Sequence, residues 1–163
     1  MRALRPKMRH TGKLAVAVLA AALPAAASAS AGGTMTVSAT VLPRCMVEAG
    51  EMTFGTLAGD GPQASAQSQL TLECTPGTAY AVTLDEGLRG DRRMVEERGI
   101  GFLDYEIFQD AAGTRRWDAS AAGSVAGVAP SDGRISLNAY GRIAGQATTA
   151  GRYGDVVTVT VQF

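Results

Sequence analysis

The last eleven residues of the sequence, YGDVVTVTVQF (153–163), carry its clearest structural signal. Side chains of a β-strand point alternately to its two faces, so an apolar residue at every second position predicts a strand with one buried face. That face holds Tyr153, Asp155, Val157, Val159, Val161 and Phe163. The sequence ends inside this strand, and we expect its outer edge to need a partner, because an unpaired edge is a template for aggregation.

Strand-like alternation recurs along most of the sequence before residue 153. It is found in TMTVSATVL (34–42), in a short run from Cys45, and in the segments 52–57, 67–74, 78–85, 103–110 and 134–143. The segment 119–133 is rich in Ala, Gly, Ser and Pro, which predicts a surface loop or a weak strand. No stretch has the apolar spacing and caps of a long helix. The sequence therefore predicts an all-β sandwich.

Residues 1–31 predict a secretory signal peptide that is cleaved after Ala29 or Ala31. A basic stretch to Lys13 precedes the apolar run LAVAVLAAAL (14–23), and small residues follow. This run is too short to span a bilayer as a stable anchor, although an uncleaved N-terminal anchor is the alternative. Since no other segment approaches 18 apolar residues, we expect no stable membrane insertion. The mature chain is expected to be soluble or to be assembled outside the inner membrane.

The two cysteines of the chain, Cys45 and Cys74, are expected to form a disulfide. Export places the chain in an oxidising compartment, where such pairs form and persist. Closing a loop of about 30 residues stabilises the fold by roughly 3–4 kcal/mol on the chain-entropy estimate. Two cysteines without a mature histidine make a poor metal site.

Composition argues against nucleic-acid binding and against catalysis by histidine. From residue 30 onward the sequence has ten Arg, no Lys and fifteen Asp or Glu, a formal charge of about −5. Phosphate binding needs clustered positive charge instead. The only histidine, His10, lies in the signal peptide. We predict no catalytic, cofactor-binding or metal-binding residues, and no cofactor.

Two groups of side chains can be interpreted as an enzymatic site or as a sugar-binding site. Asp104 and Glu106 share one strand face, as paired carboxylates of glycosidases do, but that face is expected to meet solvent. Trp117, Tyr105 and Phe108 could form a sugar-binding surface, whereas buried sandwich aromatics are the more common case.

The alternating segment 34–42 has little to pack against in its own domain. Only Pro43 and Arg44 separate it from Cys45, which hinders folding back across the sandwich. We therefore expect it to add as a strand to a second molecule. Burying Met35, Val37, Ala39 and Val41 there gives on the order of 5–9 kcal/mol before hydrogen bonds and ordering costs. The alternative is an ordinary first strand of a closed sandwich.

The ordered set of segments resembles the spore coat protein U domain family, the fold of archaic (Csu-type) chaperone–usher pilins. The resemblance covers about residues 34–163, and no single piece is diagnostic. The matching pieces are Cys45 with MTFGTL, then LTLECTPGTAYAVTLDEG, LDYEIFQDAAGTRRW and AYGRIAGQATTAGRYGDVVTVTVQF. Residues 92–102 and 119–133 depart from the family pattern.

The resemblance implies an incomplete immunoglobulin-like domain that is completed by donor-strand exchange. A periplasmic chaperone would lend the missing strand, and an outer-membrane usher would replace it with the next pilin subunit's N-terminal segment. The resemblance thus implies that the chain passes through the periplasm to a pilus at the cell surface. The implied divisions are a signal peptide (1–31), a donor segment (32–44) and the pilin domain (45–163). The chain then looks like a single-domain pilus subunit in adhesion or biofilm formation; the alternative is a discrete secreted or spore-coat protein with a self-completed sheet. The donor side chains would be Met35, Val37, Ala39 and Val41, and the acceptor or chaperone contacts would be Val157, Val159, Val161 and Phe163.

Overall fold

The structure, a computed structural model, describes residues 28–57, 64–143 and 149–163. The chain divides into two units, Met1–Ala39 and Thr40–Phe163. In the described part of the first unit, residues 28–39, no helix or strand is formed. The described part of the second unit contains nine strands and no helix. The strands are β1 (Cys45–Ala49), β2 (Ser65–Cys74), β3 (Ala79–Leu84), β4 (Arg93–Glu96), β5 (Phe102–Phe108), β6 (Val125–Val128), β7 (Arg134–Ile143), β8 (Tyr153–Gly154) and β9 (Val159–Gln162).

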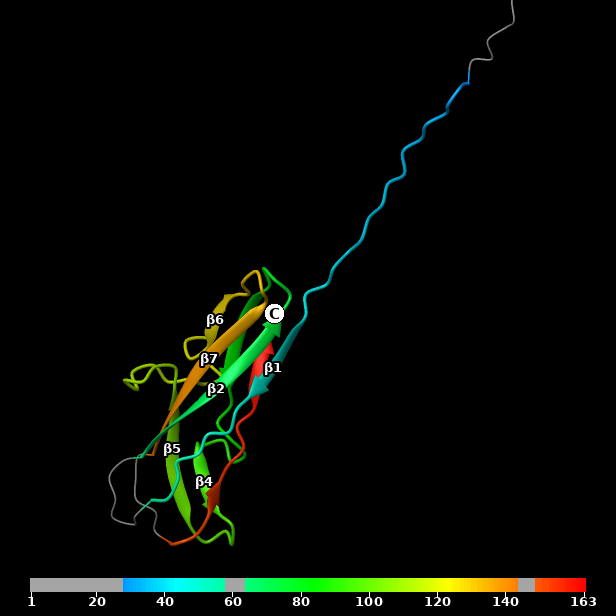
Figure 1. Cartoon of the computed structure of the whole chain (residues 1–163). Helices are drawn as coiled ribbons and strands as arrows, with labels where there is room; N and C mark the ends of the chain where they lie inside the picture. Colours follow the sequence, from blue (N-terminus) through cyan, green and yellow to red (C-terminus); the bar gives the residue numbers. More distant parts are fainter. Residues whose placement is uncertain (1–27, 58–63, 144–148) are drawn as a thin grey trace, which may run out of the picture. The chain divides into compact units, whose positions relative to one another are not determined.

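The strands form two antiparallel sheets, which confirms the predicted all-β fold. The larger sheet has the order β1-β2-β7-β5-β4-β8, and the smaller has the order β6-β3-β9 (Figure 1). Strands β2 and β7 pair over nearly their whole length, from Ser65 opposite Arg142 to Glu73 opposite Arg134. In the described residues, β1 is therefore one edge of the larger sheet and β9 one edge of the smaller.

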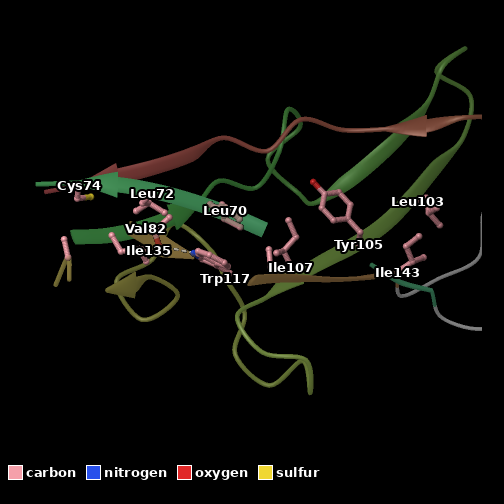
Figure 2. Close-up of a cluster of buried hydrophobic side chains, with 13 residues drawn as sticks. Leu70, Leu72, Cys74, Val82, Leu103, Tyr105, Ile107, Trp117, Ile135 and Ile143 are labelled. Atoms are coloured by element: carbon pink, nitrogen blue, oxygen red, sulfur yellow. Dashed lines mark hydrogen bonds between the residues drawn. The ribbon is translucent and has the colours of Figure 1, made fainter. Parts of the chain in front are cut away.

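The core lies on the faces that the sequence alternation predicted. Strands β2, β3, β5 and β7 each contribute alternate buried side chains, drawn together in Figure 2. Trp117 is fully buried, and its indole N–H donates a hydrogen bond to the Val82 carbonyl at 3.0 Å. Tyr105 is buried as well. Burial is thus confirmed for Trp117 and Tyr105, whereas Phe108 is only half-buried, with the Arg142 guanidinium 5.6 Å from its ring centroid. The buried strand residues are Leu70, Leu72, Cys74, Val82, Leu84, Leu103, Tyr105, Ile107, Ile135, Ala139 and Ile143.

The strand predicted at residues 52–57 is wrong. The structure has no strand there, and Gly55 has φ of 75°, which interrupts an extended conformation. The apolar residues alternate here because Met52 and Phe54 are half-buried against the core, although the segment forms no strand. Both side chains lie over Gly141 of β7, where an added Cβ would stand 2.3 Å from the Met52 sulfur.

The single strand predicted over residues 153–163 is also wrong, because the structure divides it between the two sheets. Strand β8 pairs with β4 in the larger sheet, and β9 pairs with β3 in the smaller. Residues 155–158 cross from one sheet to the other. Their main-chain groups are bound by two aspartates, Asp85 and Asp155, instead of by a neighbouring strand.

Candidate functional site

Two strands that lie side by side each have one edge without a partner in the described part of the chain. Strand β9 pairs with β3 alone, and β1 pairs with β2 alone. Cα atoms of β1 and β9 approach to within 8 Å, and Figure 1 shows the two strands next to each other. The edges of the two sheets thus meet on the same side of the domain.

The pairing of β9 with β3 fixes which of its main-chain groups face the free edge. The Asp85 N–H donates to the Thr158 carbonyl at 3.0 Å, so these two residues form a hydrogen-bonded pair. In an antiparallel ladder such pairs recur at every second residue. Thr160 and Gln162 therefore bond to β3, whereas the N–H and C=O groups of Val159 and Val161 point to the free edge.

The same reasoning applies to β1. The Thr75 N–H donates to the Arg44 carbonyl at 2.8 Å, and the Gly50 N–H donates to the Gln69 carbonyl at 2.9 Å. The even-numbered residues of β1 therefore bond to β2. The main-chain groups of the odd-numbered residues, Cys45, Val47 and Ala49, point away from β2.

The side chains of the predicted acceptor row lie on one face of the free edge. Val157, Val159 and Val161 are half-buried and pack against the core, while Thr160 and Gln162 are exposed. Val157 belongs to the crossing segment and not to β9. Phe163 follows β9 and is 57% exposed. The edge therefore combines free main-chain groups with apolar side chains that turn inward. The acceptor role of these residues stays a prediction.

The predicted donor segment forms no strand in this single chain. Met35 and Val37 are each 86% exposed, and Ala39 and Val41 are exposed as well. The segment ends at a fixed point, because Arg44 N–H also donates to the Thr75 hydroxyl at 3.1 Å. An alternating apolar row that is exposed along its length is the expected state of a strand without a partner. The donor role of residues 34–42 stays a prediction.

Sequence reasoning missed a pair of aspartates at the start of β9. The Asp155 carboxylate accepts hydrogen bonds from Leu88 N–H at 3.0 Å, from Val156 N–H at 2.8 Å and from the Tyr105 hydroxyl at 2.6 Å. Asp85 accepts from Gly87 N–H at 3.0 Å and from Thr158 N–H at 2.9 Å. A signal was present in the sequence, since Asp155 is the one charged residue in an otherwise apolar alternating row.

Burial and hydrogen bonds shift the pKa values of Tyr105 and Asp85 in this cluster. Burial, the Asp155 hydrogen bond and the Asp155 charge raise the pKa of the Tyr105 hydroxyl well above its usual range, so it stays a donor. Burial alone would raise the pKa of Asp85. The hydrogen bonds from Thr158 and Gly87 outweigh burial, and the pKa of Asp85 lies below its ordinary value.

A buried arginine lies next to Tyr105, the tyrosine that binds Asp155. Arg92 is 1% exposed and adopts a positive φ of 52°. Its Nη2 donates to the Trp117 carbonyl at 2.9 Å, and its Nε lies 3.7 Å from a Glu86 carboxylate oxygen. Its guanidinium also lies over the Tyr105 ring, 5.9 Å from the centroid. Arg92 thus links the loop after β3 to Trp117 and to the tyrosine that binds Asp155.

The two carboxylates that were considered as a catalytic pair, Asp104 and Glu106, each form an ion pair with an arginine. Asp104 accepts from Arg93 Nε at 2.6 Å, and Glu106 accepts from Arg116 Nε at 2.6 Å. Asp104 is exposed and Glu106 is partly exposed, which confirms that this strand face meets solvent. Across residues 28–57, 64–143 and 149–163, no cluster of three or more His, Cys, Asp or Glu could hold a metal.

The predicted disulfide is present, since Cys45 at the start of β1 is bonded to Cys74 at the end of β2. The predicted signal peptide, residues 1–31, lies mostly outside the described residues. In the part of the chain that is described, no helix has the length and apolar character needed to span a bilayer.

Comparison with known proteins confirms the resemblance inferred from the sequence. A search of curated proteins found no match. Among solved structures, the fold resembles one chain in the crystal structure of the CsuC–CsuE chaperone–tip adhesion subunit pre-assembly complex, from archaic chaperone–usher Csu pili of Acinetobacter baumannii. The identity is 30% and the TM-score 0.62, and the match covers 76% of this chain and 41% of that chain.

The match to a sequence family is more extensive. Residues 31–160 match the family described as Spore Coat Protein U domain, and the match includes all of β1, the start of β9 and most of the segment ahead of β1. Since this match spans well over half of the sequence, the chain belongs to the Spore Coat Protein U domain family.

Proposed function

We propose that the chain is a subunit of a chaperone–usher pilus, and that residues 33–42 of one subunit add as a strand to the β9 edge of the next. The observation that carries the proposal is the pair of adjacent unpaired edges, with the inward row of Val157, Val159 and Val161 along one of them. A strand added there would bond to the free main-chain groups of Val159 and Val161 and cover the apolar row.

The donor segment matches the acceptor edge in length and pattern. Residues 34–42 span about 30 Å when extended, and residues 157–163 span about 23 Å, at about 3.3 Å per residue. Four donor side chains alternate toward one face, and four acceptor residues do the same. The donor list is Met35, Val37, Ala39 and Val41; the acceptor list is Val157, Val159, Val161 and Phe163.

The link between donor and domain favours exchange between molecules over self-completion. Arg44 is already bonded to Thr75 and extends the ladder between β1 and β2, so Pro43 is the only free link residue. A two-residue hairpin onto β1 would have Leu42 and Pro43 as its central residues, and both common hairpin turns need a positive φ at the first of them. Leucine rarely adopts a positive φ. A longer loop would consume Val41, one of the four donor side chains.

Insertion requires the two edges to move apart. A strand bonded on both sides needs about 9.6 Å between its neighbours, which is twice the spacing of paired strands. Cα atoms of β1 and β9 approach closer than this, to within 8 Å. Help from a periplasmic chaperone that keeps the edges separated is therefore part of the proposal, and the solved relative was itself crystallised as a chaperone–subunit complex.

The remaining partners are proposed from the resemblance to chaperone–usher pilins, together with the placement of donor and acceptor. Donor and acceptor lie at different places on one subunit, so the contact is head-to-tail and propagates as a fibre unless the rotation closes a ring. We propose that the leader directs export, that an outer-membrane usher mediates exchange, and that the fibre serves adhesion or biofilm formation. In this reading the chain is a structural subunit and not an enzyme.

The proposal is tested by amide hydrogen exchange on the exported full-length protein. A synthetic peptide of residues 33–42 is added, and the amides of Val159 and Val161 are expected to become protected. The amides of Thr160 and Gln162 are expected to be protected already by β3. A peptide with Val37 replaced by Asp is the matched control. Unchanged exchange at Val159 and Val161 with a monomeric protein would favour the discrete, self-completed alternative.

A further inference from the structure

The start of β9 is the least supported part of the proposed acceptor edge. Residues 155–158 cross between the sheets, so neither ladder binds them continuously. Their described main-chain bonds run instead to side chains and to one residue beyond β3. Val156 N–H donates to Asp155, Thr158 N–H donates to Asp85, and the Thr158 carbonyl accepts from Asp85 N–H.

The two aspartates bind each other's segments. Asp155 lies on the crossing segment and accepts from Leu88 N–H in the loop after β3. Asp85 begins that loop and accepts from Thr158 N–H on the crossing segment. These reciprocal bonds, which we call the aspartate clasp, join positions that are 67 and 73 residues apart in the sequence.

The residues around the clasp leave room for the Asp155 carboxylate and bind its second oxygen. Gly87 has φ of 80°, and a Cβ at this position would stand 2.0 Å from an Asp155 carboxylate oxygen. Only glycine combines this conformation with so close an approach of the carboxylate. The Tyr105 hydroxyl from β5 binds the second Asp155 oxygen at 2.6 Å, so the crossing segment is also tied to the larger sheet.

The register of β9 depends on where it begins. A slip of one residue moves every side chain to the opposite face and brings the other set of main-chain groups to the free edge. In such a slip Val159 and Val161 would face solvent, and Thr160 and Gln162 would turn inward. Among the described residues, β9 pairs with β3 alone, so its register is specified by β3 and by its fixed starting point.

We propose that Asp85 and Asp155 are positioning residues that fix the register of β9 and so determine which residues an incoming strand can meet. This inference rests on the proposed function for its biological meaning, because the incoming strand is the one proposed above. The clasp itself acts in the chain without a donor. It holds the acceptor edge in one arrangement before any strand arrives.

The test compares exported full-length wild type with Asp155→Ala by amide hydrogen exchange and by binding of the synthetic peptide of residues 33–42. In the variant, we expect the amides of Leu88, Thr158 and Thr160 to exchange at least about tenfold faster. Amides of β2 and β7 are expected to be unchanged. Peptide binding is expected to weaken by about tenfold or more.

Asp132→Ala is the matched control, because Asp132 also accepts a main-chain hydrogen bond, from Arg134 N–H at 3.2 Å, in a turn outside the clasp. It should leave the exchange of Thr160 and the peptide binding unchanged. If Asp155→Ala does not fold, Tyr105→Phe removes a single bond to the same carboxylate and should give a smaller change in the same amides.

Each outcome separates the clasp from the proposed function. Faster exchange at Thr160 with weaker peptide binding supports the clasp. If the Thr160 amide of Asp155→Ala exchanges at the wild-type rate, the proposed role of the clasp is overturned. Where Asp155→Ala does not fold, the same result in Tyr105→Phe overturns the proposed role. If wild type binds no peptide but the exchange of Thr160 still responds to the substitution, the clasp stands and strand donation is refuted.

Discussion

Replacing Val37 by Asp is expected to impair assembly of the subunits without affecting the folding of each subunit. In the single chain the Val37 side chain is 86% exposed and belongs to no strand. An exposed substitution of this kind changes the free energy of unfolding by no more than about 0.5 kcal/mol. The proposed function, in contrast, buries this side chain in the central part of the donor strand. The substitution is therefore expected to leave the subunit folded and to act on strand donation.

The expected loss of binding affinity follows from the burial of the residue 37 side chain when the donor strand inserts. Burying a valine contributes about 1.5–3 kcal/mol, which the variant loses. Burying an unpaired carboxylate costs several kcal/mol more, unless the group becomes protonated. Together these terms exceed about 3 kcal/mol, which corresponds to a loss of more than about 100-fold in affinity. The variant therefore loses a large part of the 5–9 kcal/mol expected from the four donor side chains.

The assay combines electron microscopy of fibres from the exporting cells with the urea unfolding midpoint of the purified subunit. We expect few or no fibres from Val37→Asp and an unchanged midpoint. Ser38→Asp is the control, since Ser38 is the next residue, equally without a strand, and points to the opposite face when the segment is extended. It should form fibres at close to the normal level.

Two results would refute the reasoning. Normal fibre yield from Val37→Asp would mean that this side chain is not buried on assembly. Equal loss of fibres in Ser38→Asp would mean that the segment is sensitive to any charge, so the alternation has no role in assembly.

Three further predictions concern the domain itself. Trp117→Phe removes the hydrogen bond to the Val82 carbonyl and leaves a void, so it should lower the free energy of unfolding by about 2–4 kcal/mol in urea denaturation; no change would contradict its central place in the core. Replacing both Cys45 and Cys74 by Ser should cost about 3–4 kcal/mol, measured in the same way against the oxidised wild type. The pKa of Asp85 is lowered in the folded chain, so its stabilising contribution is full above about pH 4 and decreases as the pH falls below that value; Asp85→Asn should flatten this acid limb of the stability profile, and a parallel profile would contradict the assignment.

The sequence predicted the central strands because their burial follows a period of two. Leu70 and Leu72 on β2, and Leu103 and Ile107 on β5, are buried as their alternation indicated. The disulfide was predictable for a different reason, since the sequence has only one pair of cysteines and its N-terminus predicts export. These features depend on local pattern or composition alone.

The strand predictions were wrong where contacts with distant parts of the chain determine the local structure. Residues 52–57 alternate like a strand, but Met52 and Phe54 pack against Gly141 without forming a ladder. The break at Asp155 depends on bonds to Leu88 and Tyr105, which lie 67 and 50 residues away. A period of two shows that side chains alternate, and it carries no information on which sheet receives them.

The position of the disulfide has a mechanical consequence for the proposed fibre. Tension on the N-terminal segment reaches the domain at the start of β1, at Arg44 and Cys45. Among the described residues β1 pairs with β2 alone, and in the proposed fibre the inserted strand would lie along its other edge. Hydrogen bonds pulled from such an end would break one after another. The covalent bond to Cys74 instead transmits the load into β2, which has neighbours on both sides, so the force is spread over many bonds at once. A reduced fibre should consequently yield at a lower pulling force than an oxidised one, starting with the peeling of β1.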